Sequence, residues 1–266
     1  MDASRYLDRI GLSPGDESRS ALALETLQRR HLATVPFTNL FVYNDAGTTP
    51  EPETAVPRIV SGGGGLCYDC NGGFAWLLEE LGYDVSLLSA RPRHDDGTYG
   101  PEYDHLALLV EDHLVDVGFG DFARQPLPLD GGPRSDVSGT YRIVAADRDG
   151  GTDSTVDSTI DDECTHLVER QTGDAWEPVY RFDTTPRRPS AFAGMADFHA
   201  TSPDSHFAGD RLATLPTEDG RLTLAGATLT ITEGDRKRKE PVPPGAVETV
   251  LADRFGLDER ALSPTT

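Results

Sequence analysis

The hydrophobic period of the chain changes at Gly82. Before it, GGFAWLLEEL carries apolar residues at the i, i+3, i+4 and i+7 positions of a helix, counted from Phe74. After it, from Tyr83 to about Asp183, apolar residues fall in short strand-like runs separated by Gly, Pro and Asp: DVSLLSARP, HLALLV, HLVDVGF, GTYRIVA, THLVERQ and PVYRFD. Helices followed by many strands predict an α+β fold with a barrel-like sheet, not a doubly wound one.

Three regions follow from the same patterns. Residues 1–82 are predicted to be largely helical, 83–185 to form the sheet, and 186–266 to make a mixed cap with a hairpin, RLTLAGATLTITEG, and a final amphipathic turn, AVETVLADRFGL. Residues 147–163 are acidic and lack apolar periodicity, so we expect an exposed loop there. The early helical periodicity is carried by Tyr6, Leu7, Ile10, Leu24, Leu27, His31 and Leu32.

Charge is the strongest signal in the composition. The sequence has 45 Asp and Glu against 24 Lys and Arg, a formal net charge of −21, and its only lysines are Lys237 and Lys239. Such a surface repels nucleic acid. The acids are spread along the chain instead of gathered in one tail. This favours a solvated surface adapted to molar salt, where self-repulsion is screened, over an ordinary acidic protein.

The cysteine content and the N-terminal segment indicate the compartment. Three cysteines are too few for a disulfide framework and fit a reducing environment. The segment MDASRYLDRIGL lacks the basic-then-apolar order of a secretory signal, and no apolar run approaches the roughly 18 residues of a membrane helix. We therefore expect a cytoplasmic protein without membrane contact.

Cys67 lies between a run of four glycines and the predicted helix. At the first turn of a helix, free backbone N–H groups and the positive end of the dipole stabilise an anion, so a thiol there becomes more acidic. The glycines let the backbone bend and let a substrate approach closely. The alternative is a flexible loop followed by a small buried cysteine.

A second cysteine, Cys70, follows three residues later. A redox dithiol would need a surrounding βαβ unit, whereas here helices precede the motif. A zinc site would need a second ligand pair, and Cys164 with His166 is the only candidate. We expect that Cys70 packs against neighbouring helices or replaces a polar residue, and that no metal is bound.

A base and an orienting carboxylate are supplied by the segment DHLALLVEDHLVDVGFG. In a hairpin turning at residues 111–112, His105 and Asp116 become diagonal neighbours on one face, close enough for a hydrogen bond. A slip of one residue would separate them, and either residue alone could instead be a half-buried strand residue. The remaining histidines lack such a partner pattern and are interpreted as structural or exposed: His31, His94, His113, His166, His199 and His206.

Six segments occur in the order and approximate spacing of a known family: YLDRIGL, LETLQRRHLATVPFTNL, GGLCYDCNGGFAWLLEELGYDVSLLSARP, DHLALLV, LVDVGFGD and TSPDSHF. Through them the chain resembles the arylamine N-acetyltransferases over nearly its whole length. The resemblance implies a papain-like core with a helical domain carrying the nucleophile (1–82), a β-barrel domain carrying the His and Asp (83–185) and an α/β lid (186–266). It also implies a triad of Cys67, His105 and Asp116, in agreement with the hairpin argument.

The chain departs from the family pattern around these residues. Where the family has Arg four residues before the cysteine, and Glu and Gln after it, this chain has Gly63, Asp69 and Cys70. The departure predicts that a supporting ion pair between that Arg and Glu is absent. The residue before the histidine is usually Thr, whereas here it is Asp104, a negative charge near the path of coenzyme A phosphates.

The resemblance implies ping-pong acetyl transfer. The Cys67 thiolate takes the acetyl group from acetyl-CoA as a thioester and passes it to an arylamine, while His105 acts as base and Asp116 orients it. The expected partners are a small-molecule arylamine and coenzyme A, and the oligomeric state is not predicted.

The resemblance also places three aromatic residues around the pocket: Phe37, Phe119 and Phe207. Flat apolar rings suit an arylamine. Two alternatives stay open because a triad does not encode its acyl donor. One is a related thiol acyltransferase, amide synthase or hydrolase with a different donor, and the other is a non-catalytic binding protein of the same fold.

Overall fold

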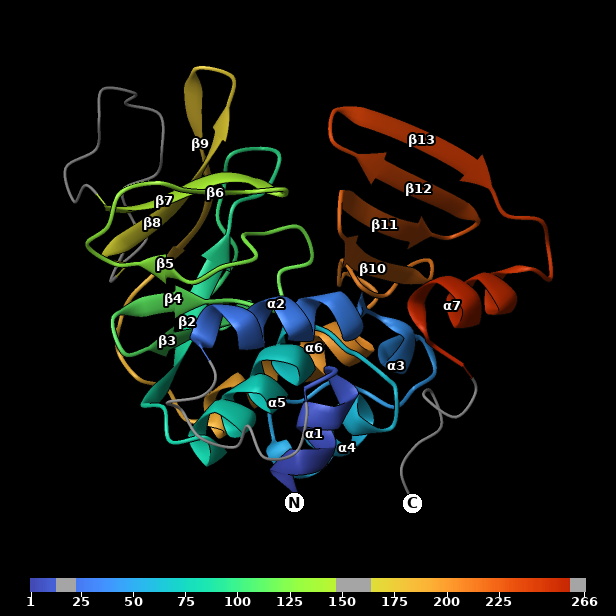
Figure 1. Cartoon of the computed structure of the whole chain (residues 1–266), viewed down its shortest axis with the longest axis horizontal. Coiled ribbons are helices and arrows are strands. Elements are labelled where there is room, and N and C mark those ends of the chain that lie inside the picture. Colours follow the sequence, from blue (N-terminus) through green and yellow to red (C-terminus); the bar gives the residue numbers. More distant parts are fainter. Residues whose placement is uncertain (13–22, 147–163, 259–266) are drawn as a thin grey trace.

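The computed structural model describes residues 1–12, 23–146 and 164–258, so the predicted loop at 147–163 lies outside the described residues. The described part of residues 1–82 is largely helical, as predicted. It forms the layer beneath two sheets in Figure 1 and consists of α1 (Ala3–Arg9), α2 (Leu24–Thr34), the short strand β1 (Phe37–Thr38), α3 (Leu40–Tyr43), α4 (Pro52–Val60) and α5 (Cys67–Glu80).

Helix α5 is the central helix of this layer and is buried along most of its length. A glycine on it permits close packing, because a Cβ on Gly72 would lie 2.5 Å from the carbonyl oxygen of Pro50. The helix ends just before Gly82, whose φ of +86° favours glycine. Both ends of the predicted helix, at Cys67 and next to Gly82, are therefore confirmed.

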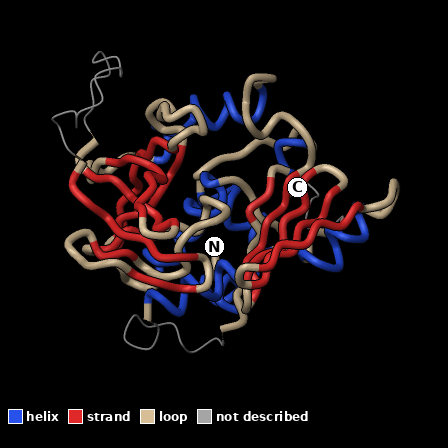
Figure 2. The backbone as a smooth tube through the Cα atoms, turned by 90° about the horizontal axis from the view of Figure 1, so that it is seen from above, coloured by secondary structure: helices blue, strands red, loops and turns tan. Residues whose placement is uncertain are grey.

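An eight-stranded antiparallel sheet follows in the order β5-β4-β3-β2-β9-β8-β7-β6. It curls until β5 lies against β7, which nearly closes a barrel (Figure 2). Tyr141, Tyr180 and Phe182 are among the side chains that fill its interior. Its strands are β2 (Val85–Pro92), β3 (His105–Val110), β4 (His113–Val115), β5 (Leu127–Pro128), β6 (Arg134–Asp136), β7 (Gly139–Ala145), β8 (His166–Thr172) and β9 (Ala175–Phe182).

All six predicted runs contain strands, but HLVDVGF pairs only as far as Val115. Beyond that point the backbone N–H of Gly118 donates to Oδ1 of Asp116 at 2.9 Å, and Gly120 has a φ of +91°. The chain therefore leaves the ladder and forms a loop that carries Phe119. The short strands β5 and β6 lack an alternating pattern and were not predicted.

A five-stranded antiparallel sheet, in the order β1-β10-β11-β12-β13, forms the second sheet of Figure 1. Its C-terminal strands are β10 (Leu212–Thr217), β11 (Gly220–Ala225), β12 (Thr228–Glu233) and β13 (Arg236–Pro241), and the predicted hairpin at 221–234 corresponds to β11 and β12. Helix α7 (Val247–Phe255) packs on this sheet through Val247, Leu251 and Phe255. Strand β13 was not predicted, because RKRKEP has no apolar alternation.

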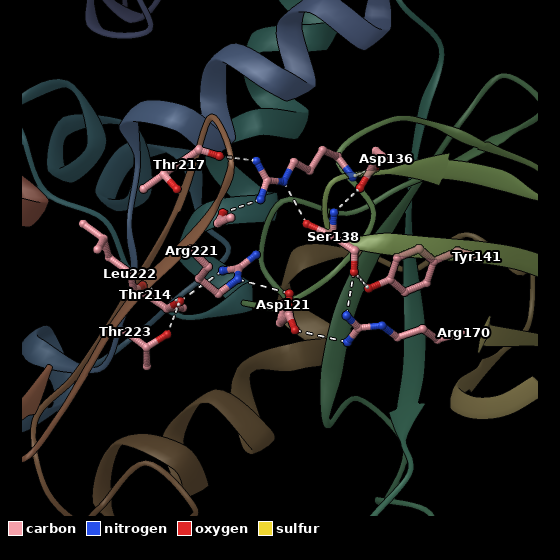
Figure 3. Close-up of polar contacts among 12 residues, drawn as sticks. Asp121, Asp136, Ser138, Tyr141, Arg170, Thr214, Thr217, Arg221, Leu222 and Thr223 are labelled. Atoms are coloured by element: carbon pink, nitrogen blue, oxygen red, sulfur yellow. Dashed lines mark hydrogen bonds and ion pairs between the residues drawn. The ribbon is translucent and has the colours of Figure 1, made fainter. Parts of the chain in front are cut away.

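The loop that carries Phe119 is clamped between the two sheets (Figure 3). Asp121 accepts hydrogen bonds from Arg170 of β8 and from Arg221 of β11, each at 3.1 Å. Arg124 donates to two carbonyl oxygens at the turn between β10 and β11. These bonds fix the loop relative to both sheets.

The chain thus has the α+β class predicted from its sequence. The cap also contains η1 (Pro189–Phe192), a 3-10 turn, and α6 (Ala193–Thr201), which contribute Phe192 and Ala196 to the helical core. The three-domain division at residues 82 and 185 stays a prediction. Within the described ranges, every helix is too short or too polar to cross a lipid bilayer.

Candidate active site

Cys67 is the first residue of α5, and its side chain lines a pocket of about 250 Å³ although it is only 4% exposed. The preceding Leu66 has an extended backbone, and its N–H donates to Oδ2 of Asp69 at 3.3 Å. The carboxylate in the first turn therefore fixes where the helix begins. It holds the thiol at the end of the helix where an anion is stabilised.

His105 and Asp116 form the hydrogen bond that the hairpin predicted. The pairing of Val110 with His113 and of Leu108 with Val115 confirms the register. The ladder ends there, yet Nε2 of His105 lies 2.7 Å from Oδ2 of Asp116. Since Nε2 is engaged by the carboxylate, Nδ1 is the ring nitrogen left to serve Cys67, which lines the same pocket.

Asp116 is held by groups that sequence reasoning missed. Nδ2 of Asn71 donates to its Oδ1 at 2.9 Å, and the Tyr180 hydroxyl donates to its Oδ2 at 3.2 Å. Asn71 also accepts from the backbone N–H of Val117 at 2.9 Å and donates to the carbonyl of Leu106 at 2.7 Å. Asn71 lies one turn after Cys67 on α5, and this helical spacing was the available signal. Tyr180 had no comparable signal.

These contacts set the protonation of the imidazole. Burial alone lowers the pKa of His105, but the charge and hydrogen bond of Asp116, together with Cys67, raise it from 6.5 to about 10. His105 therefore carries a proton at neutral pH when it faces Asp116.

The ion pair between positions 63 and 69 is absent, as expected from Gly63, but an arginine from another helix pairs with Asp69 instead. Nη1 of Arg58, on α4, lies 2.7 Å from Oδ1 of Asp69, and the Asp69 side chain is fully buried. Thr48 and the backbone N–H of Thr49 also donate to this carboxylate. Burial raises the pKa of the Asp69 carboxyl, while Arg58 and Thr48 oppose that rise. An arginine five residues before Gly63 thus supplies the partner.

Cys70 is fully buried, and its thiol donates to the carbonyl oxygen of Gly65 at 3.4 Å. Burial raises the pKa of Cys70 well above its ordinary value, and the charges of Asp69 and Cys67 raise it further. It faces the interior, as the packing interpretation expected. In the described ranges no group of three or more His, Cys, Asp or Glu side chains has the arrangement of a metal site.

The pocket has an aromatic side and a polar side. Phe37, Phe119 and Phe207, the three residues expected around the substrate, all line it with Cys67 and His105. Sequence reasoning gave no place in the site to three further histidines. The structure puts all three in its wall beside Asp104, so that four of the chain's seven histidines line one pocket: His94, His105, His199 and His206.

A buried thiol at a helix start, an imidazole in the same pocket and a carboxylate bonded to the imidazole form the arrangement of enzymes with a cysteine nucleophile. The comparisons with known proteins narrow this class. A family model described as N-acetyltransferase matches residues 22–261. The arylamine N-acetyltransferase of Mycolicibacterium smegmatis is 30% identical over 272 residues, which are 97% of this chain and 92% of the relative.

Two further matches support the relationship to arylamine N-acetyltransferases and similar enzymes. Proansamycin X synthase of Amycolatopsis mediterranei (strain S699) is 30% identical over 207 residues, 74% of this chain and 73% of the relative. The solved structure of Mycobacterium marinum arylamine N-acetyltransferase in complex with CoA has a TM-score of 0.82 and 27% identity, and the match covers 98% of this chain and 95% of that one. The chain belongs to the arylamine N-acetyltransferase family, and the papain-like fold implied by the resemblance is confirmed.

Proposed function

We propose that this enzyme transfers an acetyl group from acetyl-CoA to an arylamine through a thioester on Cys67. The observation that carries the proposal is the placement of Cys67 and His105 in one pocket with aromatic walls, with His105 hydrogen-bonded to the buried carboxylate of Asp116. In this assignment Cys67 is the nucleophile, His105 the general base and acid, and Asp116 the orienting carboxylate.

In the first half-reaction the Cys67 thiolate attacks the thioester carbonyl of acetyl-CoA. The new bond joins Sγ to the acetyl carbon, the bond from that carbon to the coenzyme A sulfur breaks, and the imidazolium of His105 gives its Nδ1 proton to the departing thiolate. Asp116 keeps the ring oriented and stabilises its charged form. Coenzyme A then leaves, and an acetylated cysteine stays behind.

In the second half-reaction an amine enters the same pocket. Its nitrogen attacks the acetyl carbon, the bond to Sγ breaks, and Nδ1 of His105 takes the proton that the amine loses. The amide leaves, and the thiolate–imidazolium pair is restored. One pocket therefore serves donor and acceptor in turn, which is the structural requirement of a ping-pong sequence.

We assign ring recognition to the three phenylalanines. Phe37 and Phe207 meet edge to face with ring centroids 5.9 Å apart, and Phe119 stands edge to face with His105 at 5.1 Å. These faces lie beside the reacting thiol, where an aromatic ring that carries the amine would pack. The coenzyme A complex of the relative from M. marinum supports coenzyme A as the donor. No step of this mechanism uses a metal.

A second candidate keeps the thioester and changes its acyl group or acceptor. The relative from A. mediterranei is named a synthase instead of an N-acetyltransferase. The same triad would support amide synthesis or hydrolysis with another donor. A non-catalytic binding protein of this fold would keep the pocket without reacting at Cys67.

The setting that we propose is the cytoplasm at high salt, without nucleic-acid or membrane partners. A cysteine count of three, too few for a disulfide framework, and a net charge of −21 support this assignment.

Intact-mass spectrometry tests the proposed function. The protein in about 2 M KCl, where surface charge is screened, is mixed with acetyl-CoA and quenched, then mixed with a panel of arylamines. We expect one acetyl adduct on Cys67 that the arylamines discharge. The absence of any adduct after mixing with acetyl-CoA would contradict the transferase assignment. Loss of the acetyl group to water as fast as to the amines would favour a hydrolase.

A further inference from the structure

A second imidazole–carboxylate pair lies in the wall of the pocket. Nε2 of His199, on α6, is 3.0 Å from Oδ1 of Asp104, and the two side chains are only 3% and 10% exposed. Both residues line the pocket that Cys67 and His105 line. This pair joins residues 95 apart in the chain and plays no part in the proposed mechanism.

The carboxylate of Asp104 is fixed close to the reacting groups. Asp104 directly precedes His105, and its backbone carbonyl accepts a hydrogen bond from the Tyr68 hydroxyl at 3.2 Å. Tyr68 in turn directly follows Cys67. The backbone of Gly100 closes over the second oxygen, since a Cβ there would lie 2.3 Å from Oδ2. Asp104 therefore cannot turn its charge away into bulk water.

The hydrogen bonds around His199 fix the orientation of its ring. Oγ of Ser205 accepts from the N–H of Phe207 at 3.1 Å and lies 3.1 Å from Nδ1 of His199. Nε2 on the other side of the ring faces Asp104. Because buried charges in proteins are paired, the imidazole of His199 is the side chain placed to compensate this carboxylate.

Nothing else in the wall offers a permanent positive charge. Among the residues that the structure describes, no lysine or arginine lines this pocket. Of the other three imidazoles, that of His105 is engaged by its own carboxylate, Asp116. His94 and His206 have rings 5.4 Å apart, and His206 is solvent-exposed. Without His199, the Asp104 carboxylate would face the pocket as an uncompensated negative charge in a protein that already carries −21.

We propose that His199 is a specificity-determining residue, which neutralises Asp104 so that negatively charged acyl donors can reach Cys67. Coenzyme A thioesters carry phosphates, so an unpaired carboxylate beside Cys67 would repel them and leave neutral donors unaffected. The pair explains how Asp104 is accommodated next to His105. The identity of the charged donor rests on the proposed function, whereas the effect of the pair on anions does not.

Two thiol reagents of nearly the same shape measure this effect directly. Iodoacetate is an anion and iodoacetamide is neutral, so the ratio of their alkylation rates at Cys67, followed by peptide mass spectrometry, reports the charge near the thiol. In His199→Gln the amide can still donate a hydrogen bond to Asp104 but carries no charge. We expect the iodoacetate-to-iodoacetamide ratio to fall about fivefold. The double variant with Asp104→Asn should return to within about twofold of the parent.

A matched control comes from a third histidine–aspartate pair. His113 lies 2.6 Å from Asp112 on the hairpin, where Asp112 is exposed and His113 half-buried. Neither residue lines the pocket, so His113→Gln should leave the ratio unchanged. Asp104→Asn alone, which does not depend on the folding of His199→Gln, should raise the ratio. An unchanged ratio in both His199→Gln and Asp104→Asn would overturn the proposal.

A comparison of a charged and a neutral acyl donor tests the effect of His199 on the reaction itself. Acylation of Cys67 by acetyl-CoA should weaken in His199→Gln through a higher KM, while acylation by the neutral ester p-nitrophenyl acetate stays within about twofold of the parent. Equal loss with both donors would mean a merely structural role and would overturn the proposal. If the parent reacts with the ester and not with acetyl-CoA, the donor assignment fails, and the haloacetate ratio still decides the role of the pair.

Discussion

Two imidazole–carboxylate pairs place their imidazoles in the wall of one pocket, and they differ in what the second ring nitrogen faces. His105 bonds to Asp116 at 2.7 Å and turns its other nitrogen to Cys67, whereas His199 bonds to Asp104 at 3.0 Å and turns its other nitrogen to Ser205. The same pair of functional groups can thus activate a nucleophile or only balance a charge. The group that the second ring nitrogen faces distinguishes these two roles. The following variants test this distinction.

The largest expected effect is the loss of acetylation when Cys67, the thiol beside the His105–Asp116 pair, is replaced. Cys67→Ala should abolish acetylation, because among the described residues Cys67 is the one cysteine that lines the pocket with His105. The matched control is Cys70→Ala, which removes a buried thiol one turn away and should keep most of the activity. The measurement is the acetyl adduct by intact mass. Comparable loss in the two variants would contradict the assignment and revive a dithiol mechanism.

Replacing the carboxylate of each pair by an amide should have very different effects on the rate of Cys67 acetylation. Asp116→Asn can hold the wrong imidazole tautomer, so acetylation of Cys67 should slow by roughly 10³- to 10⁴-fold. Asp104→Asn leaves the His105 tautomer unchanged and should alter the rate by less than about tenfold. Single-turnover acetylation measures both. A rate within about threefold of the parent for Asp116→Asn, worth only ~0.65 kcal/mol, would remove its assigned role.

A buried pair that does not line the pocket, Arg58 with Asp69, extends the comparison to stability. Arg58→Met leaves a buried carboxylate without its charged partner, so the free energy of unfolding should fall by about 3–5 kcal/mol. The control is Arg29→Met, which removes an exposed pair with Glu25 and should cost less than about 1 kcal/mol. Urea unfolding measures both. Equal costs would show that burial of the Arg58 pair is irrelevant.

The proton on His105 predicts a pH dependence of stability. An unfolded histidine has a pKa near 6.5, whereas His105 in the fold has one of about 10. This site's contribution to stability is therefore complete below about pH 6.5 and is lost as pH rises through about 10. Between about pH 7 and 10 the Tm of the parent should fall more steeply than that of Asp116→Asn, which lacks the charged partner. Parallel curves would contradict the raised pKa.

The smallest effect separates surface charge from the buried pairs. Raising KCl from about 0.1 M to about 2 M shortens the Debye length from about 10 Å to below about 3 Å, which screens exposed carboxylates far more than buried ones. We expect the Tm and the rate of Cys67 acetylation to rise. A variant that neutralises four exposed acids, Asp8→Asn, Glu53→Gln, Asp95→Asn and Asp174→Asn, should respond less. If the Tm of the parent did not rise with KCl, the acidic composition would not be an adaptation to high salt.

The first histidine pair could be predicted because a local rule connects its members. Two strands joined by a two-residue turn have a fixed register, and a period of two places His105 and Asp116 on one face. Cys67 could likewise be placed, since glycines before a helical pattern mark where the helix begins. Local periodicity was therefore sufficient for the three proposed catalytic side chains.

The second pair and the Arg58 pair could not be predicted, because tertiary packing brings their members together. His199 reaches Asp104 only when α6 packs beside the start of β3. Arg58 reaches Asp69 because α4 lies against α5, a geometry that the glycines of α5 permit but no sequence period encodes. Strand β13 could not be predicted for a related reason. Its sequence has no apolar alternation, and its backbone pairing with β12 holds it in the extended form.

The two-residue strand β1 has a consequence for the order in which the enzyme is built. Phe37, which lines the pocket, pairs with Thr214 of β10, a partner that leaves the ribosome long after Cys67, His105 and Asp116. A nascent chain thus acquires its reactive thiol and base before the wall that encloses them. Stalled chains ending at about residue 185 should accordingly expose Cys67 to alkylation by bulky reagents, and the protection should appear only once β10 has been synthesised.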